Sequence, residues 1–258
     1  MDKSMQVLKN IFSIESETAI VTGGASGIGA SIAECFHSLG ANVIIADLNE
    51  DALKKQQEKI GSDRCKIFQC DIADESKANE LSNFAIERFG KVDILVNSHG
   101  ISRRASADDI TSEDYDVVLN VNLRSVFLTT SIIGRHMVKR KKGSIINISS
   151  ISAHVCLPNN VNYSAAKGGM EAMTRSFAGE WAKHGVRVNV IAPGPVRTPF
   201  TEAIYADPAY EKALLQKVPR GVISTSDEYL GATLLLASGA GANIVGQTIV
   251  MDGGFIIV

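Results

Sequence analysis

Three residues near the middle of the chain combine the groups that could move a proton to or from an alcohol. Tyr163 and Lys167 lie four residues apart at the start of a helical pattern, so they share one face of the helix. Ser150 precedes Tyr163 by thirteen residues and follows an apolar, β-branched run at residues 144–148, which predicts a buried strand. A strand end, a loop and a helix start can therefore bring a hydroxyl, a phenol and an ammonium group together.

The phenol becomes useful for this chemistry if its pKa falls toward neutrality. A free phenol has a pKa near ~10, and a neighbouring ammonium group favours the phenolate, so we expect Lys167 to lower the pKa of Tyr163. Tyr163 would then serve as a base toward an alcohol or an acid toward a ketone, while Ser150 holds the same oxygen. The alternative is a half-buried tyrosine beside a solvated lysine, because this spacing is common.

A glycine-rich turn near the amino terminus predicts a phosphate-binding site. The apolar run at residues 18–22 leads into Gly23-Gly24-Ala25-Ser26-Gly27-Ile28-Gly29, and a helical pattern follows as far as Gly40. Glycines let the backbone approach a pyrophosphate, and the helix N-terminus offers amides and a positive dipole. Glycines also serve any tight turn, so the turn alone is weak evidence.

Asp47 ends the next predicted strand, residues 42–46, and lies 18 residues after Gly29. A carboxylate at this place accepts hydrogen bonds from ribose hydroxyls and repels a 2′-phosphate. No Lys or Arg stands directly beside Asp47 in the sequence, which favours NAD over NADP. The alternative role is a helix N-cap, for which Asn49 is better placed.

The rest of the chain alternates between strand and helix patterns. Further strands are predicted at about 65–70, 93–96, 186–191 and 247–250, and helices at about 49–60, 74–89, 111–138 and 227–237. Alternation at this spacing indicates an α/β fold with a single doubly wound parallel sheet of about seven strands, Rossmann-type, with helices on both faces. We expect one domain over residues 1–258, with an irregular substrate lid at about 195–226.

Composition narrows the function classes. The 258 residues are 45% hydrophobic and 21% charged, which is typical of a globular protein, and the net charge of −2 gives no reason to expect nucleic acid. Cys35, Cys65, Cys70 and Cys156 lack C-x-x-C spacing and are interpreted as core residues in a reducing, cytoplasmic compartment. We see no signal peptide and no apolar run of membrane length. The basic run at 139–142 is expected to be a solvated helix cap.

Taken together, these motifs resemble the short-chain dehydrogenase/reductase family in its classical branch, from about residue 18 to 254. The motifs occur in the family order: TGGASGIG at 22–29, Asp71-Ile72 after the third strand, NSHG at 97–100, Asn122 in VNLRSVF, Ser150, Tyr163-x-x-x-Lys167, and PGPVRTP at 193–199. The resemblance implies a dinucleotide-dependent oxidoreductase that assembles as a homotetramer or dimer.

The resemblance also implies roles for individual residues. The catalytic set is Asn122, Ser150, Tyr163 and Lys167, with Tyr163 as acid/base and Asn122 supporting a proton-relay water. The cofactor-binding set is Gly23, Ser26, Gly27, Ile28, Gly29, Asp47, Leu48, Asp71, Ile72, Asn97, Gly100, Tyr163, Lys167, Pro193, Gly194, Val196 and Thr198. No metal site is implied. Where the family usually has alanine this chain has His99, which we interpret as structural, with an effect on ribose packing as the alternative.

Some features further resemble enzymes that act on sugar acids, such as gluconate 5-dehydrogenase. Arg103 and Arg104 could pair with a substrate carboxylate, or they could be solvated loop residues. His154 and Asn160 are further candidates for substrate contacts. We therefore expect an NAD-dependent enzyme that transfers a hydride between the nicotinamide and a secondary alcohol or ketone, a sugar acid or polyol.

Two alternatives stay open. A 3-oxoacyl-thioester reductase could use the same scaffold, with NADPH and an apolar pocket. A catalytically silent dinucleotide-binding protein is the more remote alternative, because a fold does not imply an activity. None of these functions involves nucleic acid or a membrane.

Overall fold

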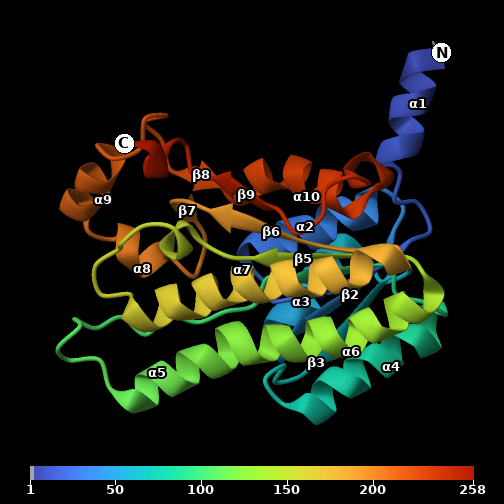
Figure 1. The fold of residues 1–258 in the computed structure, drawn as a ribbon, viewed down its shortest axis with the longest axis horizontal. Coiled ribbons are helices and arrows are strands. Elements are labelled where there is room, and N and C mark those ends of the chain that lie inside the picture. The colour runs from blue at the N-terminus through green and yellow to red at the C-terminus, as the bar shows by residue number, and fades with distance from the viewer. Residues whose placement is uncertain (1–2) are drawn as a thin grey trace.

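The computed structural model describes residues 3–258, and its centre is a seven-stranded parallel sheet (Figure 1). The strand order is β3-β2-β1-β4-β5-β6-β9, and every neighbouring pair is parallel. The predicted doubly wound sheet is therefore confirmed. The strands are β1 (Thr18–Thr22), β2 (Asn42–Asp47), β3 (Cys65–Gln69), β4 (Ile94–Asn97), β5 (Gly143–Ile148), β6 (Val186–Pro193) and β9 (Thr248–Met251).

Helices cover both faces of the sheet and form two hydrophobic cores. Alternate strand residues point to opposite faces, so Ala19 and Val21 of β1 lie in one core and Ile20 lies in the other. Helices α2, α3 and α10 contribute to the first core, and α4, α6 and α7 to the second. Their bounds are α2 (Gly27–Ser38), α3 (Glu50–Ile60), α4 (Glu75–Phe89), α6 (Ser125–Arg140), α7 (Val161–Trp181) and α10 (Leu230–Ala237).

One helical run extends from Ser112 to Arg140 against the sheet. It consists of α5 (Ser112–Leu119), a π-helical segment (Asn120–Arg124) and α6. The Thr111 side chain caps it by accepting from the Asp114 amide at 3.0 Å. By length and composition alone, this run could cross a membrane. However, 56% of its apolar window is buried inside the protein, as in a core helix.

The sequence predicts an irregular segment at about 195–226, but the structure contains short regular elements there. Strand β7 (Val196–Arg197) pairs in parallel with β8 (Ser224–Thr225), and two short helices lie between them, α8 (Glu202–Tyr205) and α9 (Pro208–Leu215). Figure 1 shows these helices beyond the carboxyl end of β6. Elements this short leave no hydrophobic period in the sequence, which explains why they were missed.

The amino-terminal segment also contains a helix that was not predicted. Helix α1 (Lys3–Phe12) projects from the rest of the protein in Figure 1. Met5, Val7 and Leu8 on this helix remain about half exposed, at 51%, 52% and 50%. Gln6, Lys9 and Asn10 interrupt the apolar residues and hide the amphipathic pattern in such a short segment.

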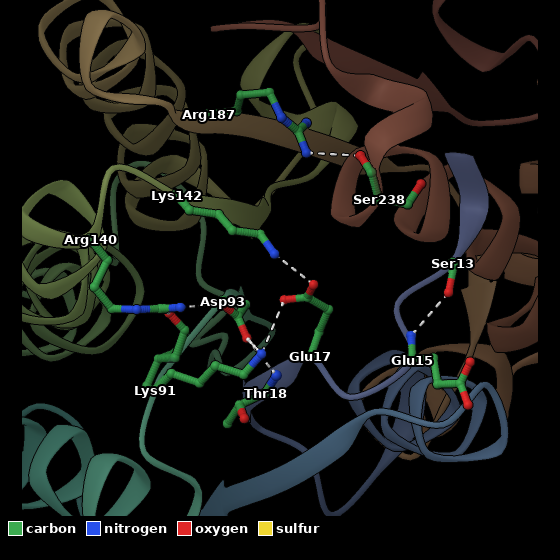
Figure 2. Close-up of polar contacts among 11 residues, drawn as sticks. Ser13, Glu15, Glu17, Thr18, Lys91, Asp93, Arg140, Lys142, Arg187 and Ser238 are labelled. Atoms are coloured by element: carbon green, nitrogen blue, oxygen red, sulfur yellow. Dashed lines mark hydrogen bonds and ion pairs between the residues drawn. The ribbon is translucent and has the colours of Figure 1, made fainter. Parts of the chain in front are cut away.

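At the amino ends of the strands, a buried ionic cluster joins the first strand to β4 and α6 (Figure 2). The Asp93 side chain is 2% exposed, pairs with Lys91 and with Arg140 at 3.0 Å each, and accepts from the Thr18 amide at 2.9 Å. Burial alone would raise the pKa of Asp93, but the hydrogen bonds from the Thr18 amide, Lys91 and Arg140 lower it to about 2. Asp93 therefore stays ionised and ties three segments together.

The basic run at 139–142 contributes to this cluster. Arg140 donates to the Val92 carbonyl at 2.8 Å as well as to Asp93, and Lys142 pairs with Glu17 at 2.7 Å. Lys141 ends α6 in the left-handed conformation, with φ 57°. The prediction of a merely solvated helix cap is therefore wrong for Arg140, because tertiary contacts use its guanidinium group.

The prediction that the cysteines are core residues is confirmed at two of the four positions, since Cys35 is only partly buried and Cys156 is exposed. All four are free thiols, and Cys65 and Cys70 are buried as predicted. Burial raises the pKa of Cys65 to about 11 and that of Cys70 to about 12, so both thiols are unreactive. Cys156 is exposed and is not a core residue.

Candidate active site

A cavity of about 750 Å³ opens at the carboxyl ends of the strands. It lies where open α/β sheets bind ligands. Predicted site residues that line it are Gly23, Ser26, Gly27, Ile28, Asp47, Leu48, Asp71, Ile72, Gly100, Arg104, Ser150, Asn160, Tyr163, Lys167, Pro193, Gly194, Val196 and Thr198. Five predicted site residues are not among the described residues that line the cavity, namely Gly29, Asn97, Arg103, Asn122 and His154. Most of the predicted site is therefore brought together in one cavity.

Ser150, Tyr163 and Lys167 converge on this cavity as their spacing predicted. Ser150 follows β5, and its hydroxyl lies within hydrogen-bonding reach of Tyr163. Tyr163 and Lys167 lie one turn apart on α7, with the Lys167 Nζ 5.5 Å from the centre of the Tyr163 ring. The same Nζ donates to the carbonyl of Ile148, the last residue of β5, at 2.7 Å. This bond anchors the buried lysine to the sheet.

Burial dominates the electrostatics of this group. It raises the pKa of Tyr163 to about 12, although the hydrogen bond with Ser150 favours the phenolate. Burial also lowers the pKa of Lys167 to about 7, against the opposing effect of Glu171. The expectation that Lys167 lowers the pKa of Tyr163 is therefore wrong here, because desolvation of the phenolate outweighs it. The raised pKa means that Tyr163 holds its proton at neutral pH, so the unliganded protein carries the acid form of the residue.

Glu171 places a buried carboxylate one turn beyond Lys167, and it was missed in the sequence. Its Oε1 lies 3.1 Å from the His154 Nε2, and its Oε2 accepts from the Thr248 hydroxyl at 3.4 Å. The available signal was the spacing of four residues between Lys167 and Glu171, which puts both on one helix face. His154, predicted to contact substrate, is bound to Glu171 and stands outside the described cavity lining.

The glycine turn fits the pyrophosphate of a dinucleotide. Gly23 and Gly27 have φ values of +65° and +54°, in the left-handed region that favours glycine. A Cβ added to Gly29 would lie 2.2 Å from the Gly23 carbonyl oxygen, and one added to Gly27 would lie 3.3 Å from Thr198. Because α2 begins at Gly27, the amides of its first turn lie beside the cavity.

The Asp47 carboxylate is held between the end of β2 and the glycine turn. Its Oδ1 accepts from the Asn49 amide at 3.1 Å, and its Oδ2 accepts from the Ala25 amide at 3.4 Å. Asn49, rather than Asp47, caps α3, since its side chain accepts from the Ala52 amide at 3.0 Å. Residues lining the cavity after β2 and β3 are Asp47, Leu48, Cys70, Asp71 and Ile72.

Asn97 and Asn122 lie behind the cavity wall. The fully buried Asn97 donates to Asn147 Oδ1 at 2.8 Å and accepts from the Thr129 hydroxyl at 2.8 Å. The Asn122 side chain donates to the Ile101 carbonyl at 2.7 Å and accepts from its amide at 2.9 Å. Asn122 therefore holds the backbone of the wall at Ile101, whereas Asn97 links side chains behind the wall.

The two arginines predicted to meet a carboxylate have different surroundings. Arg103 is 48% exposed and pairs with Asp114 at 2.7 Å, outside the described lining. Arg104 lines the cavity, and its Nη2 donates to the Pro158 carbonyl at 3.3 Å. Of this pair, Arg104 is the one that lines the same cavity as Tyr163.

Most of the cavity wall beyond Tyr163 is apolar, which the sequence patterns did not predict. Lys217 adds a second cation there. The apolar and aromatic lining residues are Ile151, Leu157, Phe200, Ile204, Tyr205, Tyr210, Leu214 and Phe255. Most come from residues 195–226 or the carboxyl terminus, whose approach to Tyr163 is a product of tertiary folding.

Comparison with known proteins agrees with this site. A short-chain dehydrogenase family model, described as enoyl-(acyl carrier protein) reductase, matches residues 23–256. The chain is 37% identical to a D-threitol dehydrogenase of Mycolicibacterium smegmatis, over 95% of each chain. It is 36% identical to a 3-oxoacyl-[acyl-carrier-protein] reductase of Thermotoga maritima, over 95% of this chain and 99% of the other.

A solved structure shows the same architecture. It is a gluconate 5-dehydrogenase from Burkholderia cenocepacia in complex with NADP and tartrate, with a TM-score of 0.91 and 31% identity. The match covers 97% of this chain and 99% of the other. Sequence motifs, sheet order and site geometry therefore agree with these matches, and the chain belongs to the short-chain dehydrogenase/reductase family.

Proposed function

We propose that this oxidoreductase is an NAD-dependent dehydrogenase or ketone reductase acting on a small polar secondary alcohol, a sugar acid or polyol. The meeting of Ser150, Tyr163 and Lys167 at a cavity with a glycine cradle carries this proposal. The relatives named for threitol and gluconate support the substrate class.

In the proposed reaction, Ser150 and Tyr163 hold the substrate oxygen, and Tyr163 exchanges a proton with it. When bound at the cradle, the dinucleotide supplies the hydride acceptor or donor. In ketone reduction the Tyr163 phenol donates its proton, and the raised pKa keeps that proton in place until it is needed. Alcohol oxidation requires the phenolate form of Tyr163, so the phenol must first release its proton to solvent before it accepts the proton of the substrate hydroxyl. Lys167, anchored through Ile148, keeps a donor group close to the phenol.

Asp47 supports NAD as the cofactor. Its carboxylate lies in the lining after β2, where it would accept from ribose hydroxyls and repel a 2′-phosphate. The solved gluconate 5-dehydrogenase carries NADP, which is a property of that protein.

Arg104 supports an anionic group on the substrate. It lines the cavity together with Asn160 and Lys217, so cations and an amide lie near the proposed reacting centre. A carboxylate entering there would gain charge-assisted hydrogen bonds. Arg104 and Asn160 therefore remain candidates for substrate contact, whereas Arg103 and His154 do not line the described part of the cavity.

A second candidate is a 3-oxoacyl-thioester reductase. The apolar wall that includes Leu157, Phe200 and Phe255 favours it, because an acyl chain needs apolar surroundings. The Thermotoga maritima relative supports it as well. The charged residues Arg104 and Lys217 favour the first candidate.

We further propose that the chain is one domain in which residues 195–226 act as a lid. This segment supplies lining residues from Val196 to Lys217. We also propose a cytoplasmic homotetramer or dimer. Phe127 supports an interface, since it is 46% exposed and its ring centre lies 6.1 Å from that of Phe177.

A substrate panel tests the proposed function. Sugar acids, polyols, hydroxy acids and an acetoacetyl thioester are assayed with NAD(H) and NADP(H) by absorbance at the wavelength of the reduced nicotinamide. We expect turnover of a polyol or sugar acid with NAD. Turnover of the thioester alone would favour the second candidate. Binding of NADH without turnover of any panel member would contradict both and favour a silent dinucleotide-binding protein.

A further inference from the structure

The His99 ring bridges two segments of the proposed site that are far apart in sequence. Its Nδ1 lies 2.6 Å from the hydroxyl of Thr22, the last residue of β1 before the glycine turn. Its Nε2 lies 2.6 Å from the hydroxyl of Ser125, directly after the π-helical segment Asn120–Arg124 that contains Asn122. The alanine usual in the family could make neither bond.

The direction of these hydrogen bonds follows from the neighbours. The Ser125 hydroxyl donates to the Val121 carbonyl, so it must accept from the Nε2–H of His99. The Nδ1 of His99 is then unprotonated and accepts from the Thr22 hydroxyl. Burial, reinforced by the Lys167 ammonium group, lowers the pKa of His99 to about 3, so the ring stays neutral and keeps this tautomer.

The bridge is in close contact with the glycine turn. A Cβ on Gly23 would lie 2.7 Å from the Cα and amide nitrogen of His99, so the two backbones touch. His99 and Val121 both line the cavity. The imidazole ring therefore connects the glycine turn to the π-helical segment that carries Asn122.

We propose that His99 is a positioning residue that couples the cofactor-binding turn to the segment carrying Asn122. The inference rests on the dinucleotide site proposed above. Because both ring nitrogens already have partners, His99 acts through Thr22 and Ser125 and not on the substrate. The two bonds should then contribute to different steps, the first to cofactor affinity and the second to turnover.

Three substitutions separate the two bonds. The amide of His99→Asn reaches about as far as Nδ1 and can keep the bond to Thr22, whereas the longer His99→Gln reaches the position of Nε2 and can keep the bond to Ser125. His99→Ala removes both. The measurements are the NADH dissociation constant, from fluorescence, and kcat at saturating substrate. Thermal unfolding establishes that each variant is folded.

We expect His99→Ala to weaken NADH binding and lower kcat, each about five- to tenfold, the effect of losing one hydrogen bond. His99→Asn should restore the affinity but not kcat, and His99→Gln should restore kcat but not the affinity. Thr22→Val should weaken NADH binding and leave kcat unchanged, as in His99→Gln. Ser125→Ala should lower kcat and leave NADH binding unchanged, as in His99→Asn.

Two results would overturn the proposal. One is wild-type affinity and kcat in His99→Ala. The other is an equal change of both quantities in the Asn and Gln variants, which is what a purely structural role would cause. If folded wild-type protein bound neither NADH nor NADPH, the proposed function would fail, and the coupling with it.

Discussion

The ammonium group of Lys167 lies 5.5 Å from the centre of the Tyr163 ring and donates to the β5 carbonyl of Ile148. The lysine is thus fixed to the sheet on one side and to the phenol on the other. Helix α7 supplies both residues, so the relative position of their side chains is set by one turn of helix. The position of Ser150 relative to them depends on β5 packing against α7.

The first prediction concerns the proton-carrying oxygen. Tyr163→Phe removes only that oxygen, so kcat should fall by about 10²–10⁴, the usual contribution of a general acid or base. The NADH dissociation constant should stay within about threefold of the wild-type value, because the ring remains. Tyr115→Phe, in an exposed residue of α5, is the matched control and should behave as wild type. Near-normal turnover in Tyr163→Phe would contradict the assignment.

The second prediction concerns the ionisation of Tyr163 in the unliganded protein. Burial raises its pKa to about 12, so its phenolate should be absent well above neutral pH. Wild type and Tyr163→Phe should therefore gain the same absorbance at 295 nm, the phenolate band, as the pH rises to about 10. An additional phenolate signal in wild type with a midpoint near pH 8 would show that Lys167 outweighs burial.

The third prediction concerns the cofactor. A 2′-phosphate placed against the Asp47 carboxylate should cost a few kcal/mol, so kcat/KM should favour NAD over NADP by on the order of 10²-fold or more. Asp47→Ala should narrow that ratio. Asp51→Ala changes an exposed residue in the first turn of α3 and should leave the ratio of kcat/KM for NAD and NADP unchanged. Equal use of both cofactors by the wild type would rule out the ribose role of Asp47.

The fourth prediction separates the two arginines. Arg104→Ala should raise KM for a sugar acid roughly tenfold, because it removes a charge-assisted hydrogen bond of about 1.5–3 kcal/mol. Arg103→Ala is the control and should have little effect, since Arg103 pairs with Asp114 away from the lining. The matching neutral polyol should be turned over equally by all three proteins. Equal KM changes for acid and polyol in Arg104→Ala would dispose of the carboxylate contact.

The fifth prediction concerns stability. Asp93→Asn leaves the Lys91 and Arg140 cations without their carboxylate, so the free energy of unfolding at pH 7 should fall by about 2–4 kcal/mol. The folded pKa of Asp93, about 2, is below its unfolded value. The contribution of Asp93 to the free energy of unfolding is therefore present above pH 4 and is lost as the pH falls toward 2. The difference in unfolding free energy between wild type and Asp93→Asn should shrink over the same pH range.

Urea unfolding at pH 7 and pH 3 measures this difference. Asp63→Asn is the control, because Asp63 is 72% exposed and its pairs with His37 and Arg64 are solvated. Asp63→Asn should change the free energy of unfolding very little, as for most exposed pairs. If Asp93→Asn and Asp63→Asn lost similar amounts of unfolding free energy, the burial of Asp93 would not explain its contribution to stability.

Local sequence patterns were sufficient for the sheet and for the central site residues. Buried strands such as β1 and β2 are short β-branched runs, and helix caps such as Asn49 stand beside the residues they serve. Tyr163 and Lys167 are related by one turn of the same helix, so their spacing in sequence already describes their spacing in space. Glycine positions in the turn likewise report a local backbone requirement.

Tertiary structure decided what depends on contacts between distant segments. The sequence could not show that Arg103 turns to Asp114 while Arg104 lines the cavity, or that His154 binds Glu171. The raised pKa of Tyr163 could not be predicted from the sequence either, because desolvation depends on how completely other elements cover the ring. Nor could it show that His99 bridges Thr22 and Ser125, since residues that far apart meet only when β1, β4 and α6 pack together.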